Sequence, residues 1–153
     1  MNIQEFHTLC NSIADEVAQL HNDVLKTPED FKASEGNGAL CIMNASGETC
    51  MRLFGDNPAR QRQTAFYAHK KALQVWLTGH ATGAFETLVY TNQVSERDFG
   101  LSRPELIGWL GGVEARTSSG ERLILAFSGV RGEQDVAILQ KAADRLKTFS
   151  IVK

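Results

Sequence analysis

Three features that would assign a chain to a class at once are absent here: a long apolar run, an excess of one charge, and paired cysteines. No stretch of about 18 apolar residues occurs, which excludes an ordinary transmembrane helix and gives no reason to expect a membrane partner. Sixteen basic and 18 acidic residues leave a formal net charge of −2. That balance argues against nucleic acid as a partner. The three cysteines, Cys10, Cys41 and Cys50, are widely spaced without a CxxC motif, which disfavours a structural zinc site.

The N-terminal sequence, MNIQEFHTLCNSIADEV, carries acidic residues early and has no short apolar core. This is not the pattern of a secretory signal peptide, so we expect a cytoplasmic protein. With 153 residues and 42% hydrophobic composition, the chain can bury a core of its own. We therefore expect one domain over residues 1–153, with Cys10 and Cys41 buried as small apolar side chains.

Hydrophobic periodicity predicts a mixed chain of helices and strands. Helices are expected at residues 2–25, 60–77, 83–92 and 133–147, with one short helical turn at 102–105. Strands are expected at residues 39–43 and 48–54 and in a hairpin over 112–128, while 26–38 is expected to form a loop. Apolar residues on both sides of the strand ending at Ser128 indicate a central, covered strand. The order suggests helices packed on an antiparallel sheet, which is an α+β domain.

Two glycine-marked loops flank the last hairpin and suggest a polar pocket. They are Gly111-Gly112 at its start and Ser128-Gly129 at its end, just before the helix that opens at Glu133-Gln134-Asp135. Glycine lets backbone approach a ligand closely, and a helix start offers free N–H groups to an anion. The alternative is that the glycines only shape turns and that an acidic side chain caps the helix.

His80 is the best single candidate for chemistry, because it follows Gly79 at a predicted helix end. A neutral imidazole can ligate haem iron or move a proton near neutral pH. Its position near a helix C-terminus is also explained by the helix dipole alone. Lys70 and Lys71 could pair with carboxylates, haem propionates or phosphates, or could form a solvated charged face.

Other chemistry-bearing residues have simpler explanations. We expect His7 and His21 to lie on the solvated side of the first helix. Trp76 and Trp109 are expected in the core or at a subunit interface. Ser128 lacks the GxSxG context of a nucleophile.

From Gly111 to Asp135 the sequence resembles the HbpS/GlcG-like family, which includes the C-terminal domain of PduO. The family's GGxP strand, its SG-terminated strand and the acid that opens its last helix correspond to Gly111-Gly112-Val113, Ser128-Gly129 and Asp135. Lys70-Lys71-Ala72 resembles the family's basic, alanine-rich helix. Gly79-His80-Ala81-Thr82 resembles the GHSS-type segment of its haem-degrading branch. Glu114 stands where the family usually has proline.

The resemblance implies a profilin-like, three-layer α/β/α fold with a five-stranded antiparallel sheet. It also implies homo-oligomers and, in some members, haem or corrinoid-related binding. The leading hypothesis is therefore a cytoplasmic homo-oligomer that binds haem, another tetrapyrrole or a small anion, with haem degradation as its reaction if it is catalytic. Its site would comprise His80 as the metal ligand together with Lys70, Lys71, Gly111, Gly112, Ser128 and Gly129.

Two alternatives remain open at this point. One is a non-catalytic interaction or sensor module without haem, favoured by Glu114 and by the lack of a clear acid–base pair. The other is an enzyme that acts on a small carboxylate through Lys70 or Glu114.

Overall fold

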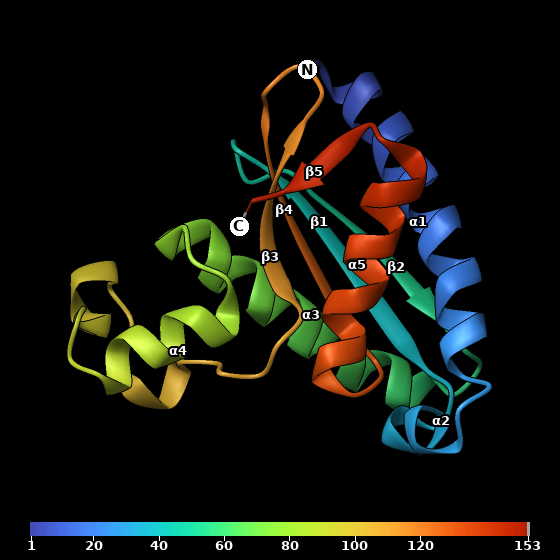
Figure 1. Ribbon diagram of the computed structural model, residues 1–153, viewed down its shortest axis with the longest axis horizontal. Helices are drawn as coiled ribbons and strands as arrows, with labels where there is room; N and C mark the ends of the chain where they lie inside the picture. Colours follow the sequence, from blue (N-terminus) through green and yellow to red (C-terminus); the bar gives the residue numbers. More distant parts are fainter. Residues whose placement is uncertain (153) are drawn as a thin grey trace.

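A five-stranded antiparallel sheet in the order β2-β1-β4-β3-β5 organises the chain (Figure 1). The structure is a computed structural model that describes residues 1–152. The strands are β1 (Gly38–Asn44), β2 (Thr49–Phe54), β3 (Gly112–Thr117), β4 (Arg122–Ser128) and β5 (Phe149–Ile151). The sheet that the resemblance implied is thus confirmed.

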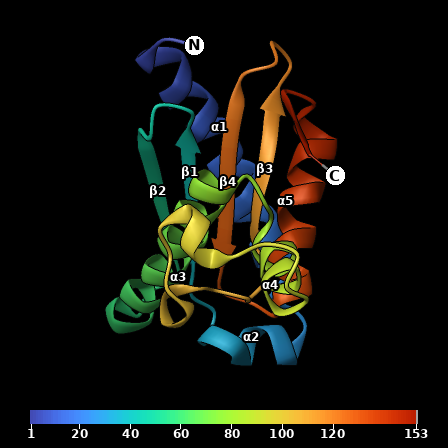
Figure 2. The ribbon, with the colours of Figure 1, turned by 90° about the vertical axis from the view of Figure 1, so that its left-hand side faces the viewer.

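Helices cover both faces of this sheet and complete a three-layer α/β/α arrangement (Figure 2). The helices are α1 (Ile3–Val24), α2 (Pro28–Ser34), α3 (Pro58–Thr78), α4 (Thr82–Tyr90) and α5 (Gly132–Leu146). Helices α1 and α5 pack on one face and α3 on the other. Helix α4 and the short 3-10 turns η1 (Glu96–Phe99) and η2 (Arg103–Glu105) form an arm, residues 82–107, that projects from the sheet (Figure 1). Within residues 1–152, no helix is both long and apolar enough to cross a bilayer.

Strand β4 is the central, doubly covered strand that its sequence predicts. Leu123, Leu125 and Phe127 face the core cluster beneath α1 and α5. Ile124 and Ala126 face the opposite cluster, beneath α3. Because successive side chains of a strand point to opposite faces, continuous apolar sequence requires cover on both sides.

The expected loop at residues 26–38 is wrong, because it contains helix α2. Pro28 stands at the first helical position after Thr27, where proline's missing N–H costs no hydrogen bond. The helix ends at Glu35, which has a left-handed backbone (φ 55°), before Gly36 (φ 77°). Strand β5 was also not expected from periodicity, because three residues are too few to show an alternation.

Helix α3 turns its small residues to the sheet and its large apolar ones to solvent. Ala68 and Ala72 are buried against β1 and β4, as the sequence suggests. Phe66, Leu73 and Leu77 are exposed along the outer face of the helix. The close approach of helix and sheet therefore leaves an apolar stripe uncovered.

His21 is buried, so the expectation that it is solvated is wrong. Its side chain is 1% exposed and its ring lies between those of Phe54 and Phe127, with centroids 5.5 and 5.3 Å away. Among the described residues, Nε2 has no hydrogen-bond partner. Burial without a partner disfavours the charged imidazolium and lowers the pKa of His21 to about 4.

This burial predicts a loss of stability in mild acid. The neutral ring is favoured in the folded state, so its contribution is complete above pH 6.5 and is lost as the pH falls toward 4. We expect the free energy of unfolding to fall by about 3 kcal/mol over that interval through His21 alone. Urea denaturation between these pH values measures the change. His21→Leu should show a flatter profile, and parallel profiles for the two proteins would contradict the assignment.

Candidate functional site

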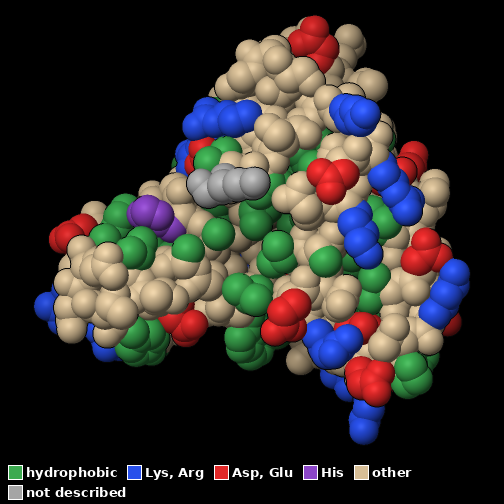
Figure 3. Space-filling view, viewed as in Figure 1, with side chains coloured by type: hydrophobic (Ala, Val, Ile, Leu, Met, Phe, Trp, Pro, Cys, Tyr) green, Lys and Arg blue, Asp and Glu red, His purple; other side chains and the backbone are tan. Residues whose placement is uncertain are grey.

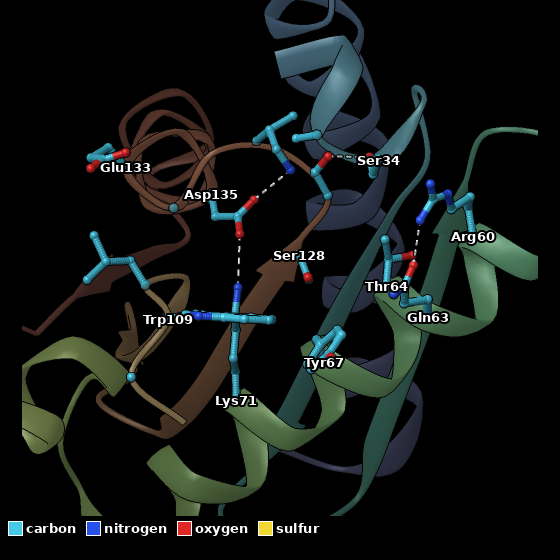
Figure 4. A pocket seen from close by; sticks show the side chains of 16 residues that line it. Ser34, Arg60, Gln63, Thr64, Tyr67, Lys71, Trp109, Ser128, Glu133 and Asp135 are labelled. Carbon is cyan, nitrogen blue, oxygen red and sulfur yellow. Dashed lines mark hydrogen bonds and ion pairs between the residues drawn. The ribbon is translucent and has the colours of Figure 1, made fainter. Parts of the chain in front are cut away.

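A pocket of ≈ 500 Å³ opens where the end of β4 meets α2, α3 and the start of α5 (Figure 4). Its lining combines a polar floor with an aromatic and apolar wall. It is lined by Ala33, Ser34, Arg60, Gln63, Thr64, Tyr67, Lys71, Gly108, Trp109, Leu110, Ser128, Gly129, Val130, Gly132, Glu133 and Asp135.

The floor of the pocket is a buried ion pair between α3 and α5. Lys71 Nζ lies 2.9 Å from Asp135 Oδ2, and the two side chains are only 2% and 3% exposed. Lys71 Nζ also donates to the carbonyl oxygen of Phe127 at 2.9 Å. Asp135 Oδ1 accepts from the backbone N–H of Val130 at 3.1 Å. An ammonium has three N–H donors, so one donor of Lys71 remains beyond these two bonds.

Burial and pairing act in opposite directions on Asp135. Burial raises the pKa of Asp135 to about 6, and the Lys71 ammonium and the backbone N–H groups of Val130 and Gly129 oppose this rise. Burying two charges costs free energy that excellent geometry only partly offsets. A buried pair with a perturbed carboxyl beside a pocket is a pattern typical of functional sites.

The anion beside the Ser128-Gly129 loop is the carboxylate of Asp135, from the same chain. The Val130 N–H, which could have faced a ligand, instead bonds Asp135. Asp135 therefore binds the loop before α5 and does not cap the helix at Arg131, which has no side-chain cap. The Ser128 side chain points into the pocket (Figure 4).

Both glycine loops pack directly around the ion pair. Gly111 has φ 119°, and a Cβ there would lie 2.5 Å from the Phe127 carbonyl oxygen, 2.8 Å from Lys71 Nζ and 2.9 Å from Asp135 Cβ. A Cβ at Gly112 would lie 2.7 Å from Thr82 Cγ2. The Gly111-Gly112 loop thus packs directly behind the contact between Lys71 and Asp135.

Helix α2 holds the other loop from outside. The Ser34 hydroxyl donates to backbone carbonyls at Gly129 and Asn37. Asp30 accepts from Arg131 Nε at 2.9 Å and from Nη2 at 3.0 Å. This bidentate bond to the guanidinium lowers the pKa of Asp30. Asp30 and Ser34 were not predicted as part of the site, although the Thr27-Pro28 start signal could have revealed their helix.

Tyr67 and Trp109 form the aromatic wall, with ring centroids 4.8 Å apart. Trp109 is 61% exposed, so it lies outside the core, and its other expected place, at a subunit interface, stays a prediction. Trp76 is half-buried against the α3-side core, where its Nε1 donates to the carbonyl oxygen of Ala45 at 3.2 Å. Only Trp109 of the two tryptophans lines the pocket.

His80 and Lys70 lie apart from the pocket lining. The His80 ring stacks on Phe85 of the arm, with centroids 6.1 Å apart and planes inclined by 16°. Lys70 is half-buried on the turn of α3 beside Lys71. Glu114 lies in β3, outside the lining, and pairs with Arg116 at 2.7 Å and Arg122 at 2.8 Å. Within the part of the chain that the structure describes, no group of three or more histidine, cysteine or acidic side chains could hold a metal ion.

The comparisons place this fold among solved structures. No protein-family model matches the sequence, and no curated protein matches it either. HbpS matches with TM-score 0.57 and 16% identity, covering 88% of this chain and 86% of HbpS. PduOC in complex with haem matches with TM-score 0.60 and 18% identity, over 94% of this chain and 93% of PduOC. The Klebsiella pneumoniae protein ORFY gives TM-score 0.63 and 15% identity, over 88% of each chain. At these identities the likeness shows a shared fold.

Proposed function

We propose that this chain, which has the fold of HbpS and PduOC, is a distant member of the HbpS/GlcG-like family and binds a small planar ligand in the pocket above Lys71 and Asp135. The observation that carries the proposal is the buried ion pair at the base of a pocket with an aromatic wall. The lining of this pocket mixes polar and apolar side chains about equally, so directed polar groups stand beside an aromatic wall, as small-molecule sites require.

The chemistry of the lining defines the ligand class. Tyr67 and Trp109 offer ring faces to a planar molecule. Lys71 has one remaining N–H donor, and Ser128 brings a hydroxyl to the same lining, so a carboxylate or another acceptor suits the floor. Two cations and two carboxylates line the pocket, so recognition comes from directed hydrogen bonds and not from net charge. Tetrapyrroles, which are planar and carry carboxylates, belong to this class.

The pocket fits the ring and carboxylates of a tetrapyrrole but not a histidine-bound iron. Its lining contains no histidine, cysteine or methionine, the usual protein ligands of haem besides tyrosine. A second candidate is therefore haem ligated by His80, which lies just before the arm, is half-buried and stacks on Phe85 of the arm. The haem complex of PduOC favours testing it. Bound haem would supply redox chemistry that the side chains lack.

Haemin titration followed by absorbance in the Soret region tests both sites in one experiment. We expect saturable binding that weakens about tenfold in Trp109→Ala, because an aromatic stacking partner contributes about 1 kcal/mol or more. His80→Ala is the matched control and should bind as the wild type does. Loss of binding in His80→Ala alone would place haem on the arm. No binding to the wild type would exclude the tetrapyrrole, and a thermal-shift screen of aromatic carboxylates that also found none would contradict the pocket proposal.

Self-association is part of the proposal. The exposed stripe of Phe66, Leu73 and Leu77 on α3 offers an apolar surface that a second copy could cover. Hydrophobic side chains also gather where the arm joins the sheet (Figure 3). We propose that the homo-oligomer is cytoplasmic. The site as described supports binding, and it assigns no residue to turnover.

A further inference from the structure

Cys10 of α1 and Cys50 of β2 lie in the same core cluster, on the face of the sheet that α1 covers. Cys10 is 4% exposed, and Cys50 is half-buried and packs against the same cluster. The register places Cys50 opposite Ile42, which faces α1. Cys41 belongs to the other cluster, beneath α3. The sheet therefore separates Cys41 from the other two cysteines.

A small hollow leads to this pair from the surface. It measures ≈ 50 Å³, is lined by both cysteines and lies between α1 and β2. That volume is large enough for a molecule the size of water or hydrogen peroxide. Arg52, two residues along β2, lines the same hollow and pairs with Asp15 of α1 at 3.6 Å.

We propose that Cys10 and Cys50 form a reversible intramolecular disulfide when the protein meets a hydroperoxide, and that this bond ties helix α1 to the edge strand β2. Cys50 reacts first, because it is the member of the pair that is open to solvent. Its thiolate sulfur attacks the peroxide, the O–O bond breaks, and Cys50 becomes a sulfenic acid while one oxygen leaves as water.

The second step closes the bond. The Cys10 sulfur attacks the Cys50 sulfur, the S–O bond breaks, and the second oxygen leaves as water with the Cys10 proton. In total, two thiols are oxidised by two electrons and one hydroperoxide is reduced to water or alcohol and water. Burial and a hydrogen bond with Cys50 raise the pKa of the Cys10 thiol, so this step is slower than the first.

The structural consequence is local to the sheet edge. Among the described residues, strand β2 pairs with β1 alone, so its other edge is open. A bond from Cys50 to α1 would fix that strand to the helix that covers it. It would also close residues 10–50 of the unfolded chain into a loop and so lower the conformational entropy of the unfolded state. Reduction by a dithiol would release it.

The test treats the whole protein with hydrogen peroxide and then alkylates the remaining thiols under denaturing conditions. We expect peptide mapping to find Cys10 joined to Cys50 with Cys41 still alkylated, and the midpoint of thermal unfolding to rise by about 5 °C until dithiothreitol is added. Dimedone added with the peroxide should label Cys50 before the disulfide accumulates. Cys50→Ala should lose the thermal shift, whereas the matched control Cys41→Ala should keep it.

Other products would overturn the proposal. These are a Cys50 oxidised to sulfinic acid while Cys10 stays alkylatable, a bond that involves Cys41, or a disulfide only between two copies of the chain. None of these results bears on the pocket, because the hollow beside the cysteine pair shares no lining residue with it.

Discussion

Replacing Lys71 with methionine should lower the free energy of unfolding by about 3–5 kcal/mol at pH 8, the loss typical when one partner of a buried ion pair is removed. Asp135 would be left 3% exposed with a charge that only backbone N–H groups oppose. Lys71 opposes the burial that raises the pKa of Asp135 to about 6, so removing Lys71 raises that pKa further. The loss should therefore shrink as the pH falls from 8 toward 6, because the carboxyl of the variant takes up a proton before that of the wild type does. Urea denaturation at pH 8 and pH 5 measures both effects.

The double variant Lys71→Met/Asp135→Leu is the control that separates the pair from its members. An apolar pair of similar volume removes both charges, so we expect it to recover most of the stability that Lys71→Met loses. The Phe127 carbonyl and the Val130 N–H would still lose their partners, so recovery should be incomplete. Equal losses in the single and double variants would contradict the account of a buried, mutually dependent pair.

The same double variant tests whether the pair serves the ligand. Natural cores can do without buried ion pairs at little cost, so their presence needs a reason beyond stability. A stable double variant that no longer binds the pocket ligand would show that the ion pair takes part in holding it. A double variant that binds the pocket ligand normally would mean that the ion pair has only a structural role.

Most of the fold could be predicted from local sequence, because its elements carry strong periodic signals. The doubly apolar sequence of β4 predicted its central place, and Ser102 with Glu105 predicted the turn that the structure shows with a capping box. Helix α2 was missed because Pro28 was interpreted as a helix breaker, although proline is favoured at a first helical position. His21 was placed on the wrong side because its polarity outweighed its position beside Leu20 on the buried face of α1.

The structure brings some of the predicted site residues together and leaves others apart, so the site itself stays a prediction. Lys71, Ser128 and Gly129 line one pocket, and Gly111 and Gly112 lie behind Lys71 outside its lining. His80 and Lys70 lie outside the lining. The pairing of Lys71 with Asp135 joins residues 64 positions apart, and no local pattern says which distant elements meet. One signal was present: Lys71 lies on the same helical stripe as Ala68 and Val75, which face the sheet. A lysine on a buried stripe requires a buried partner, and that reasoning could have pointed to an acidic residue across the sheet end.

Gly111→Ala should destabilise the protein by about 4 kcal/mol, the sum of a left-handed backbone cost and overpacking. At φ 119° the new Cβ would lie 2.5 Å from the Phe127 carbonyl oxygen, which is backbone and moves only with β4. It would also lie 2.8 Å from Lys71 Nζ, so relief of the clash must displace the ammonium from Phe127 or from Asp135. Denaturation measures the stability, and ligand titration of the surviving folded fraction should show weaker binding.

Gly120→Ala provides the matched control for the backbone cost alone. Gly120 also has a positive φ, 87°, but nothing lies within 4 Å of the position of its missing Cβ. We expect it to cost about 1 kcal/mol and to leave ligand binding unchanged. The difference between the stability losses of the two variants measures how much the close packing of the Gly111 loop against the ion pair contributes to the free energy of unfolding. Similar losses in both would mean that Gly111 serves only its own turn, and the pocket floor would then have to be assigned to Lys71 and Asp135 without the loop behind them.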